Sequence, residues 1–231
     1  RVQGKTNQFY QANAFHTQWL FDYTPDSLYY VMLETLKSAV HYGLVPDDYD
    51  VTGIEANVKR IYDNGQPIAS EIIYLDIHIT NMYFLFTTHL QEGKVREVGN
   101  AGSVWKRPVS TYPLIDVTML LEMHAVRQFP ESISRLQPSN EQYVRLQSAL
   151  DYYRFLENTS PNIFPDIVVI GRIKPDEISL AIPFIRRKLA LTALMVLPVL
   201  FDSLAGFPDS LRYDDTLMSA VKMFQVRHGL E

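Results

Sequence analysis

The stretch Ile68–Leu90 reads IASEIIYLDIHITNMYFLFTTHL, and it decides which fold class the rest of the chain can adopt. Its apolar residues recur at three- and four-residue spacing, the period of an α-helix: Ile72, Leu75, Ile79, Tyr83, Phe86 and Leu90. Other apolar residues, such as Ile73 and Phe84, lie on other faces. A helix that is apolar nearly all round is normally enclosed by others. We therefore expect the core helix of a domain here, ended by Gly93.

Shorter amphipathic patterns flank this stretch on both sides. Thr24-Pro25-Asp26 is typical of a helix start, because a hydroxyl cap precedes a proline in the first turn. Ser139 with Gln142 has the spacing of a capping box. No period-two run is long enough to predict a sheet. The predicted fold class is all-α with many helices, including 26–40, 54–61, 116–128, 140–153 and 182–191.

Composition narrows the classes of function. The 231 residues carry a net charge of −5 and no basic cluster longer than Arg186-Arg187-Lys188, which argues against a nucleic-acid partner. We expect that basic cluster to be a solvated helix face. The chain contains no cysteine, so disulfides, thiolate metal sites and a cysteine nucleophile are excluded within it.

No transmembrane segment is expected, because no apolar run approaches the roughly 18 residues that a spanning helix needs. The longest run, 194–201, contains Pro198. The start, Arg1-Val-Gln-Gly-Lys5, does not have the pattern of a signal peptide, so an exported protein would have had its signal removed.

The last stretch, Tyr213–Glu231, predicts one more amphipathic helix. Asp214 or Asp215 can cap its start. Leu217, Val221 and Phe224 recur at helical spacing, and Gly229 supplies a left-handed stop. The pattern Tyr-Asp-x-x-Leu-x-x-Ala-Val-Lys-x-Phe-Gln-x-x-x-Gly-Leu resembles the opening of a small three-helix peptidoglycan-binding domain.

Four earlier stretches, in this order, resemble the scaffold region of large bacterial murein L,D-transpeptidases. The resemblance passes through Ile185-Arg186-x-x-Leu189 into the module at Tyr213 and covers nearly the whole chain. The four stretches are Phe9-Tyr10-x-x-Asn13-x-Phe15-x-x-x-Trp19, Ala39-x-x-x-Gly43-Leu44-x-Pro46-x-x-Tyr49, Leu75-Asp76-x-x-Ile79-Thr80-x-x-Tyr83 with His89-Leu90-x-x-Gly93-Lys94-Val95, and Ile133-x-x-Leu136-x-Pro138-x-Asn140-x-Gln142-Tyr143-x-x-Leu146-x-x-Ala149-Leu150-x-x-Tyr153-Arg154.

The resemblance implies a non-catalytic role for this chain within a larger enzyme. In such proteins a separate C-terminal domain crosslinks peptide stems through a cysteine in a Ser-His-Gly-Cys-type motif. That domain is absent here, so we expect no catalytic residue and no cofactor in this chain. The implied partners are peptidoglycan and the protein's own catalytic domain. The implied location is the bacterial cell envelope, in the periplasm.

The predicted domains are a helical scaffold over 1–205 and the truncated N-terminal part of the binding module over 206–231. Asp214, Arg227 and His228 are the ligand-binding candidates. We expect the partner helices of this module to lie beyond Glu231 or to be missing. Its helix should then pack onto the scaffold, near the apolar run 194–201, and bind murein weakly.

Other classes of function remain open at this point. A helical murein hydrolase could use carboxylates such as Glu34, Glu122 and Asp151, although nothing places two of them together. A protein–protein interaction domain is a further alternative. A downstream Ser-His-Gly-Cys motif would favour the transpeptidase and an early stop codon the interaction domain.

Three further groups of residues each have a functional and a structural interpretation. The six histidines show no metal-binding spacing, so we expect no metal site. Asp76 and Thr80 share a helix face and are expected to fix helix packing, or else to form a buried polar site. The N-terminal aromatic residues should dock onto the core, and the alternative is an exposed platform for sugar: Phe9, Tyr10, Phe15 and Trp19.

Overall fold

The computed structural model describes residues 2–21, 24–63, 68–94, 115–122, 128–159, 171–193 and 210–230. These residues form helices and no strands, which confirms the all-α prediction. Two isolated antiparallel bridges, Leu20 with Pro25 and Ile178 with Arg212, are the extended pairings among them. In the same ranges, no helix is both long and apolar enough to cross a bilayer.

The helices follow the predicted order, and most of their ends shift by a few residues. The stretch 116–128, predicted as one helix, is helical over Ile115–Leu121, and the stretch 26–40 changes from α-helix to 3-10 helix after Lys37. The helix α2 begins at Ser27 because Asp26, rather than Thr24, is its N-cap and accepts a hydrogen bond from the N–H of Leu28 at 2.7 Å. The bounds are α1 Val2–Ala12, α2 Ser27–Lys37, η1 Ser38–Tyr42, η2 Pro46–Tyr49, α3 Val51–Asp63, α4 Ala69–Glu92, α5 Ile115–Leu121, α6 Gln128–Leu136, α7 Glu141–Thr159, α8 Ile182–Ala193 and α10 Asp215–Arg227.

The chain divides into two compact units, Arg1–Gln147 and Ser148–Glu231. The division falls inside α7, so this helix contributes its first part to one unit and the remainder to the other. The domain boundary expected at 205/206 and the apolar run 194–201 lie outside the described residues.

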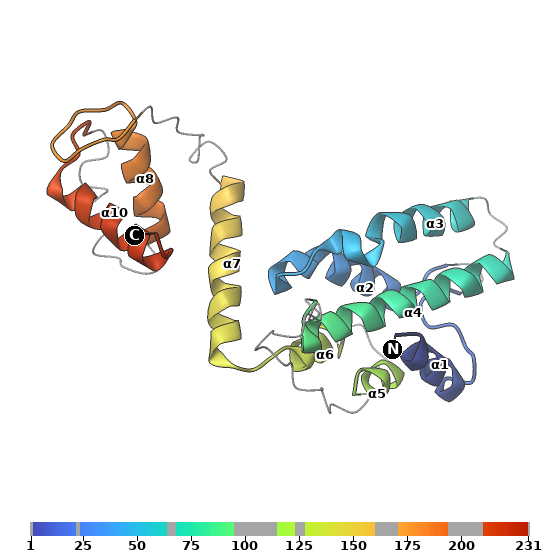
Figure 1. Ribbon diagram of the computed structural model, residues 1–231. Helices are drawn as coiled ribbons and strands as arrows, with labels where there is room; N and C mark the ends of the chain where they lie inside the picture. The colour runs from blue at the N-terminus through green and yellow to red at the C-terminus, as the bar shows by residue number, and fades with distance from the viewer. Residues whose placement is uncertain are drawn as a thin grey trace, which may run out of the picture. The chain divides into compact units, whose positions relative to one another are not determined.

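The first unit is built around α4, as predicted. This helix contacts α1, α3, α6 and η2, and Figure 1 shows it between α3 and α1. The six residues at three- and four-residue spacing are all buried in one continuous core. The prediction that other helices enclose it nearly all round is wrong for one face, where Ile73 is 50 % and Tyr74 is 78 % exposed.

A buried carboxylate attaches the N-terminal segment to α4. Asp76 is fully buried and accepts hydrogen bonds from the backbone N–H groups of Gln18, Trp19 and Leu20, the shortest of them 2.7 Å. The hydroxyl of Tyr10 donates at 2.5 Å to Oδ2 of Asp76, which also accepts the N–H of Gln18. Thr80, one turn further along α4, accepts from the indole N–H of Trp19 at 2.8 Å. The contacts confirm that Asp76 and Thr80 fix the packing of this helix.

The N-terminal aromatic residues behave in two ways. Phe9 and Trp19 are fully buried in the core of the first unit, as the docking interpretation predicts. Phe15 is 76 % exposed, so it does not dock.

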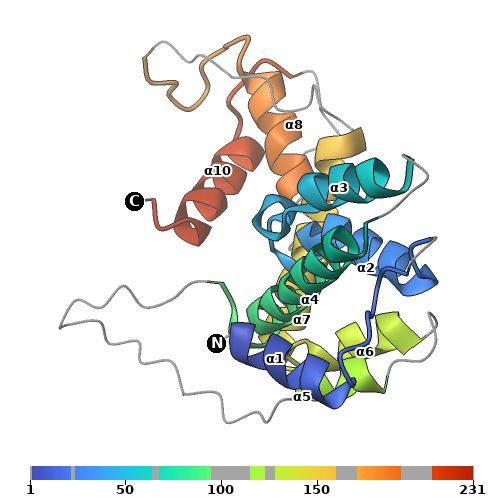
Figure 2. The same ribbon diagram turned by 90° about the vertical axis from the view of Figure 1, so that its right-hand side faces the viewer.

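In the second unit, α8 and α10 pack against each other, and Figure 2 shows them side by side. Their shared core contains Ile182, Leu189, Ala190, Leu217 and Ala220, with Val221 and Phe224 partly buried against it. The C-terminal helix therefore packs on a helix of the predicted scaffold, as expected.

Candidate functional site

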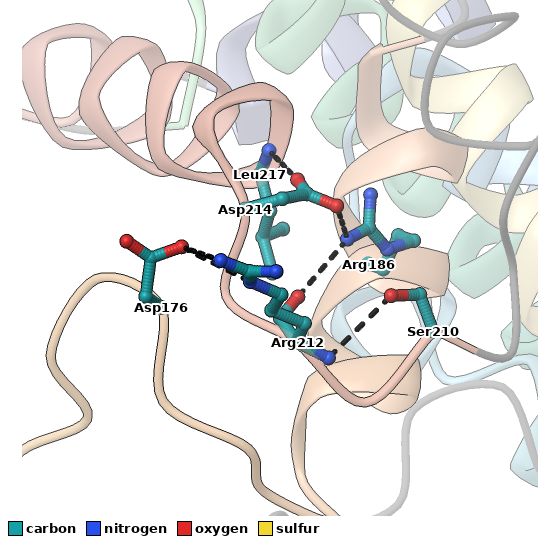
Figure 3. A network of polar contacts seen from close by, with 6 residues as sticks. All are labelled: Asp176, Arg186, Ser210, Arg212, Asp214 and Leu217. Carbon is teal, nitrogen blue, oxygen red and sulfur yellow. Dashed lines mark hydrogen bonds and ion pairs between the residues drawn. The ribbon is translucent and has the colours of Figure 1, made fainter.

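The start of α10 holds the first predicted site residue, Asp214. One oxygen of its carboxylate, Oδ1, accepts the backbone N–H of Leu217 at 2.9 Å and so caps the helix. The other, Oδ2, pairs with Nη2 of Arg186 at 2.7 Å, as Figure 3 shows. Both oxygens are therefore bound within the protein, and the sequence-predicted capping role of Asp214 is confirmed.

Arg186 connects α8 to this cap from the interior of the unit. Its side chain is 0 % exposed, so the prediction that the basic cluster 186–188 is a solvated face is wrong at its first residue. Nη2 also lies 3.4 Å from the carbonyl oxygen of Arg212. The Nε and Nη1 atoms have no hydrogen-bond partner within the described part of the chain. A buried guanidinium with unpaired donors lowers stability, because it has lost water without gaining acceptors.

Two extended segments, residues 177–179 before α8 and 211–213 before α10, are hydrogen-bonded to each other. The N–H of Ser179 donates to the carbonyl of Leu211 at 3.0 Å, and the N–H of Tyr213 donates to the carbonyl of Glu177 at 2.9 Å. The guanidinium of Arg212 adds two bonds to Oδ1 of Asp176, the shorter 2.7 Å (Figure 3). These contacts position Arg212 and Asp214 together at the entrance of α10.

The electrostatics of Asp214 favour its charged form. Burial by itself opposes ionisation, but the N–H of Leu217 and the guanidinium of Arg186 outweigh it. The pKa of Asp214 is consequently lowered from its ordinary value of 3.8. Asp214 thus presents a bound carboxylate that positions α10, and not a free base.

Arg227 and His228 lie at the opposite end of α10. Thirteen residues of helix separate Asp214 from Arg227, which corresponds to about 20 Å. Both residues are exposed; Nη2 of Arg227 donates to Oη of Tyr153 at 3.3 Å, and the ring of His228 lies 4.3 Å from that of Phe224. Arg227 and His228 are neighbours in sequence with different side-chain contacts, and the structure does not bring Asp214 to them.

The arrangement suits binding better than catalysis. An exposed guanidinium and an exposed imidazole can each donate hydrogen bonds to carboxylate or hydroxyl groups. Among the residues that the structure describes, no group of three histidine or acidic side chains could hold a metal ion.

Sequence reasoning missed Arg186, although a signal existed. Ile182, Arg186 and Leu189 follow four-and-three spacing, so Arg186 lies on the apolar face of α8. The pairing of Asp176 with Arg212 has no comparable signal, because these residues lie 36 positions apart in irregular segments.

Comparison with known proteins identifies one family. The family model described as Scaffold domain matches residues 4–150, which is more than half of the chain. The search of curated proteins and the search of solved structures each found no match.

Proposed function

The chain belongs to the Scaffold domain family and has a scaffold role, and from this premise we propose that it is the non-catalytic, cell-wall-binding region of a peptidoglycan L,D-transpeptidase. In this proposal the chain contacts peptidoglycan in the bacterial periplasm. It orients a C-terminal catalytic domain that crosslinks peptide stems.

One observation carries the proposal. The apolar residues of the pattern that resembles a peptidoglycan-binding module supply the α10 side of the core shared with α8. Leu217 and Ala220 are buried there, and Val221 and Phe224 pack against the same cluster. Asp214 caps the helix, and Gly229 has the left-handed φ of 63° that ends it. A sequence pattern that also accounts for a folded core supports the resemblance better than residue identities alone.

The ligand-binding candidates take different roles in this proposal. Arg227 and His228, exposed at one end of α10, would contact the murein. Asp214 would position the helix, because its carboxylate is occupied by Leu217 and Arg186.

The alternative of a carboxylate hydrolase gains no support from Glu34. This side chain is 71 % exposed and pairs with Lys37 at 2.9 Å, so it lacks the buried surroundings that prepare a general acid.

Co-sedimentation of the full chain with purified sacculi tests the proposal. We expect weak but saturable retention, reduced roughly tenfold in affinity by Arg227→Ala because a direct charged contact is lost. Arg187→Ala, an exposed arginine of the same unit on α8, is the matched control and should have no effect. Absence of retention at every concentration, or equal loss in both variants, would refute the binding role. A reading frame that lacked a downstream Ser-His-Gly-Cys motif would refute the link to the transpeptidase.

A further inference from the structure

A hollow of about 560 Å³ opens on the first unit, at the turn that follows α1. Its volume lies within the range typical of small-ligand sites, which combine apolar walls with a few polar groups. The residues that matter to its chemistry are Phe15, His16, Thr17, Phe21, Thr24 and Ile73.

Phe15 occupies this rim in a strained conformation. Its φ is +60°, in the left-handed region that bulky residues rarely adopt, and Ala14 before it has a φ of +50°. The turn is held by the N–H of Phe15 on the carbonyl of Tyr10 at 2.8 Å and by the Asn13 amide on the carbonyl of His16 at 3.0 Å. The ring is 76 % exposed, so packing does not offset this strain. The left-handed turn ends α1 by satisfying its last carbonyl groups, and it displays the ring of Phe15 at the rim of the hollow instead of burying it in the core.

The rest of the hollow is preformed. Asp76 holds the backbone of residues 18–20, directly after the turn, against α4. Phe21 is fixed in turn, because its carbonyl accepts the hydroxyl of Tyr62 at 2.6 Å and its N–H donates to the carbonyl of Thr24 at 3.2 Å. The ring of Phe21 is 47 % exposed. Two aromatic side chains are thus held on well-anchored backbone at one opening.

The lining selects the chemical class of the ligand. The lining residues that the structure describes include no aspartate, glutamate, lysine or arginine. Its polar side chains are the hydroxyls of Thr17 and Thr24 and the imidazole of His16, which can exchange hydrogen bonds with hydroxyl or amide groups. A pyranose ring has an apolar C–H face and a rim of hydroxyl groups, which match aromatic walls with neutral polar edges. A phosphate or carboxylate would find no arginine or lysine to neutralise it among these described lining residues.

We propose that this hollow binds a neutral sugar ring of a glycan strand, with Phe15 as the stacking residue. The inference rests on the proposed function for the identity of the glycan, and it places a second point of contact on the scaffold unit itself.

Titration of the full chain with an N-acetylglucosamine tetramer tests the proposal, followed by amide NMR shifts. We expect saturable binding with a Kd on the order of 1 mM or tighter, with shifts centred on residues 15–24. Phe15→Ala and Phe21→Ala should each weaken binding roughly tenfold. Tyr30→Ala, an exposed aromatic of the same unit outside the hollow, is the control and should leave binding unchanged.

Phe15→Gly separates function from packing. Glycine adopts a positive φ without strain, so this variant should melt at the same or a higher temperature and still lose tetramer binding. A lower melting temperature would show that the ring packs and would overturn the assignment. No shifts from the tetramer, or shifts instead with a peptide library alone, would also overturn it.

The two proposals fail separately. If retention on sacculi depended on Arg227 but the tetramer did not bind, sugar binding in the hollow would be refuted and the proposed cell-wall role would stand. If the tetramer bound but sacculi did not retain the chain, sugar binding in the hollow would stand and the proposed cell-wall role would be refuted.

Discussion

Among the residues that the structure describes, each unit buries one charged side chain completely, Asp76 in the first and Arg186 in the second, and the two differ in their hydrogen bonding. The carboxylate of Asp76 receives three backbone N–H groups and the hydroxyl of Tyr10. The guanidinium of Arg186 has acceptors only at Nη2, from Asp214 and Arg212, and its Nε and Nη1 atoms are unpaired within the described residues.

The difference follows from what surrounds each group. Asp76 lies where the N-terminal segment crosses α4, and a turning backbone supplies many N–H donors to one acceptor. Arg186 needs five acceptors, but it lies on the apolar face of α8 beside Ile182 and Leu189. A fully satisfied buried network adds rigidity, whereas a partly satisfied one lowers stability. We therefore expect the first unit to be the more stable of the two.

Removing the carboxylate of Asp76 should have the largest effect. Asp76→Ala leaves three backbone N–H groups and a hydroxyl buried without an acceptor, so the free energy of unfolding should fall by about 4 kcal/mol. Urea unfolding followed by Trp fluorescence measures it, since Trp19 reports on this unit. Asp63→Ala, at an exposed position at the end of α3, is the control and should change stability by less than about 0.5 kcal/mol. A loss below about 1.5 kcal/mol for Asp76→Ala would mean that the network contributes little.

The second largest loss of stability is expected from removing a packed side chain of α4. Leu75 is 6 % exposed, and Leu75→Ala removes transfer free energy and leaves a cavity, at a cost of roughly 2–5 kcal/mol. The same unfolding experiment applies. If the loss stayed under about 1 kcal/mol, α4 would be peripheral, and the polar network alone would account for the order of the first unit.

In the second unit, substituting Asp214 should lower stability more than substituting its ion-pair partner Arg186. Asp214→Ala removes a helix cap and leaves Arg186 without its carboxylate, so it should destabilise α10 by about 1–2 kcal/mol. Arg186→Met removes the unpaired donors together with the charge and should change stability by less than about 1 kcal/mol. Hydrogen exchange of the α10 amides measures both variants. Equal losses would show that Arg186 is better satisfied than its contacts indicate.

The smallest expected effect is the dependence of stability on pH through Asp214. The folded pKa of Asp214 lies below the ordinary value of 3.8, so the unfolded chain takes up this proton first as the pH falls. The stabilisation is complete above that ordinary value and is lost as the pH falls through the folded pKa. Asp214→Asn keeps a capping side chain and removes the charge. The difference in melting temperature between wild type and this variant should shrink from pH 6 toward about pH 3; a constant difference would exclude the contribution.

The candidate site was predictable in part, and the residues show why. The capping role of Asp214 is predictable because a cap is a local signal within the first turn of the helix, whereas ligand binding by Asp214 stays a prediction. Arg227 and His228 were correctly placed near the helix end, but their separation from Asp214 follows from helix length. The role of Arg186 was misjudged because its charge was weighed above its position in the apolar periodicity of α8.

The sequence by itself determined the helices, since the periodicity of residues such as Ile72, Ile79 and Phe86 encodes a buried face without reference to any partner. Only the tertiary structure decided which groups meet across the chain. Asp76 binds backbone 56 to 58 positions away, and Arg186 binds Asp214 at a separation of 28. The exposure of Phe15 beside the buried Phe9 and Trp19 was decided in the same way. Local patterns specify local conformation, whereas burial and polar pairing depend on packing that brings distant segments together.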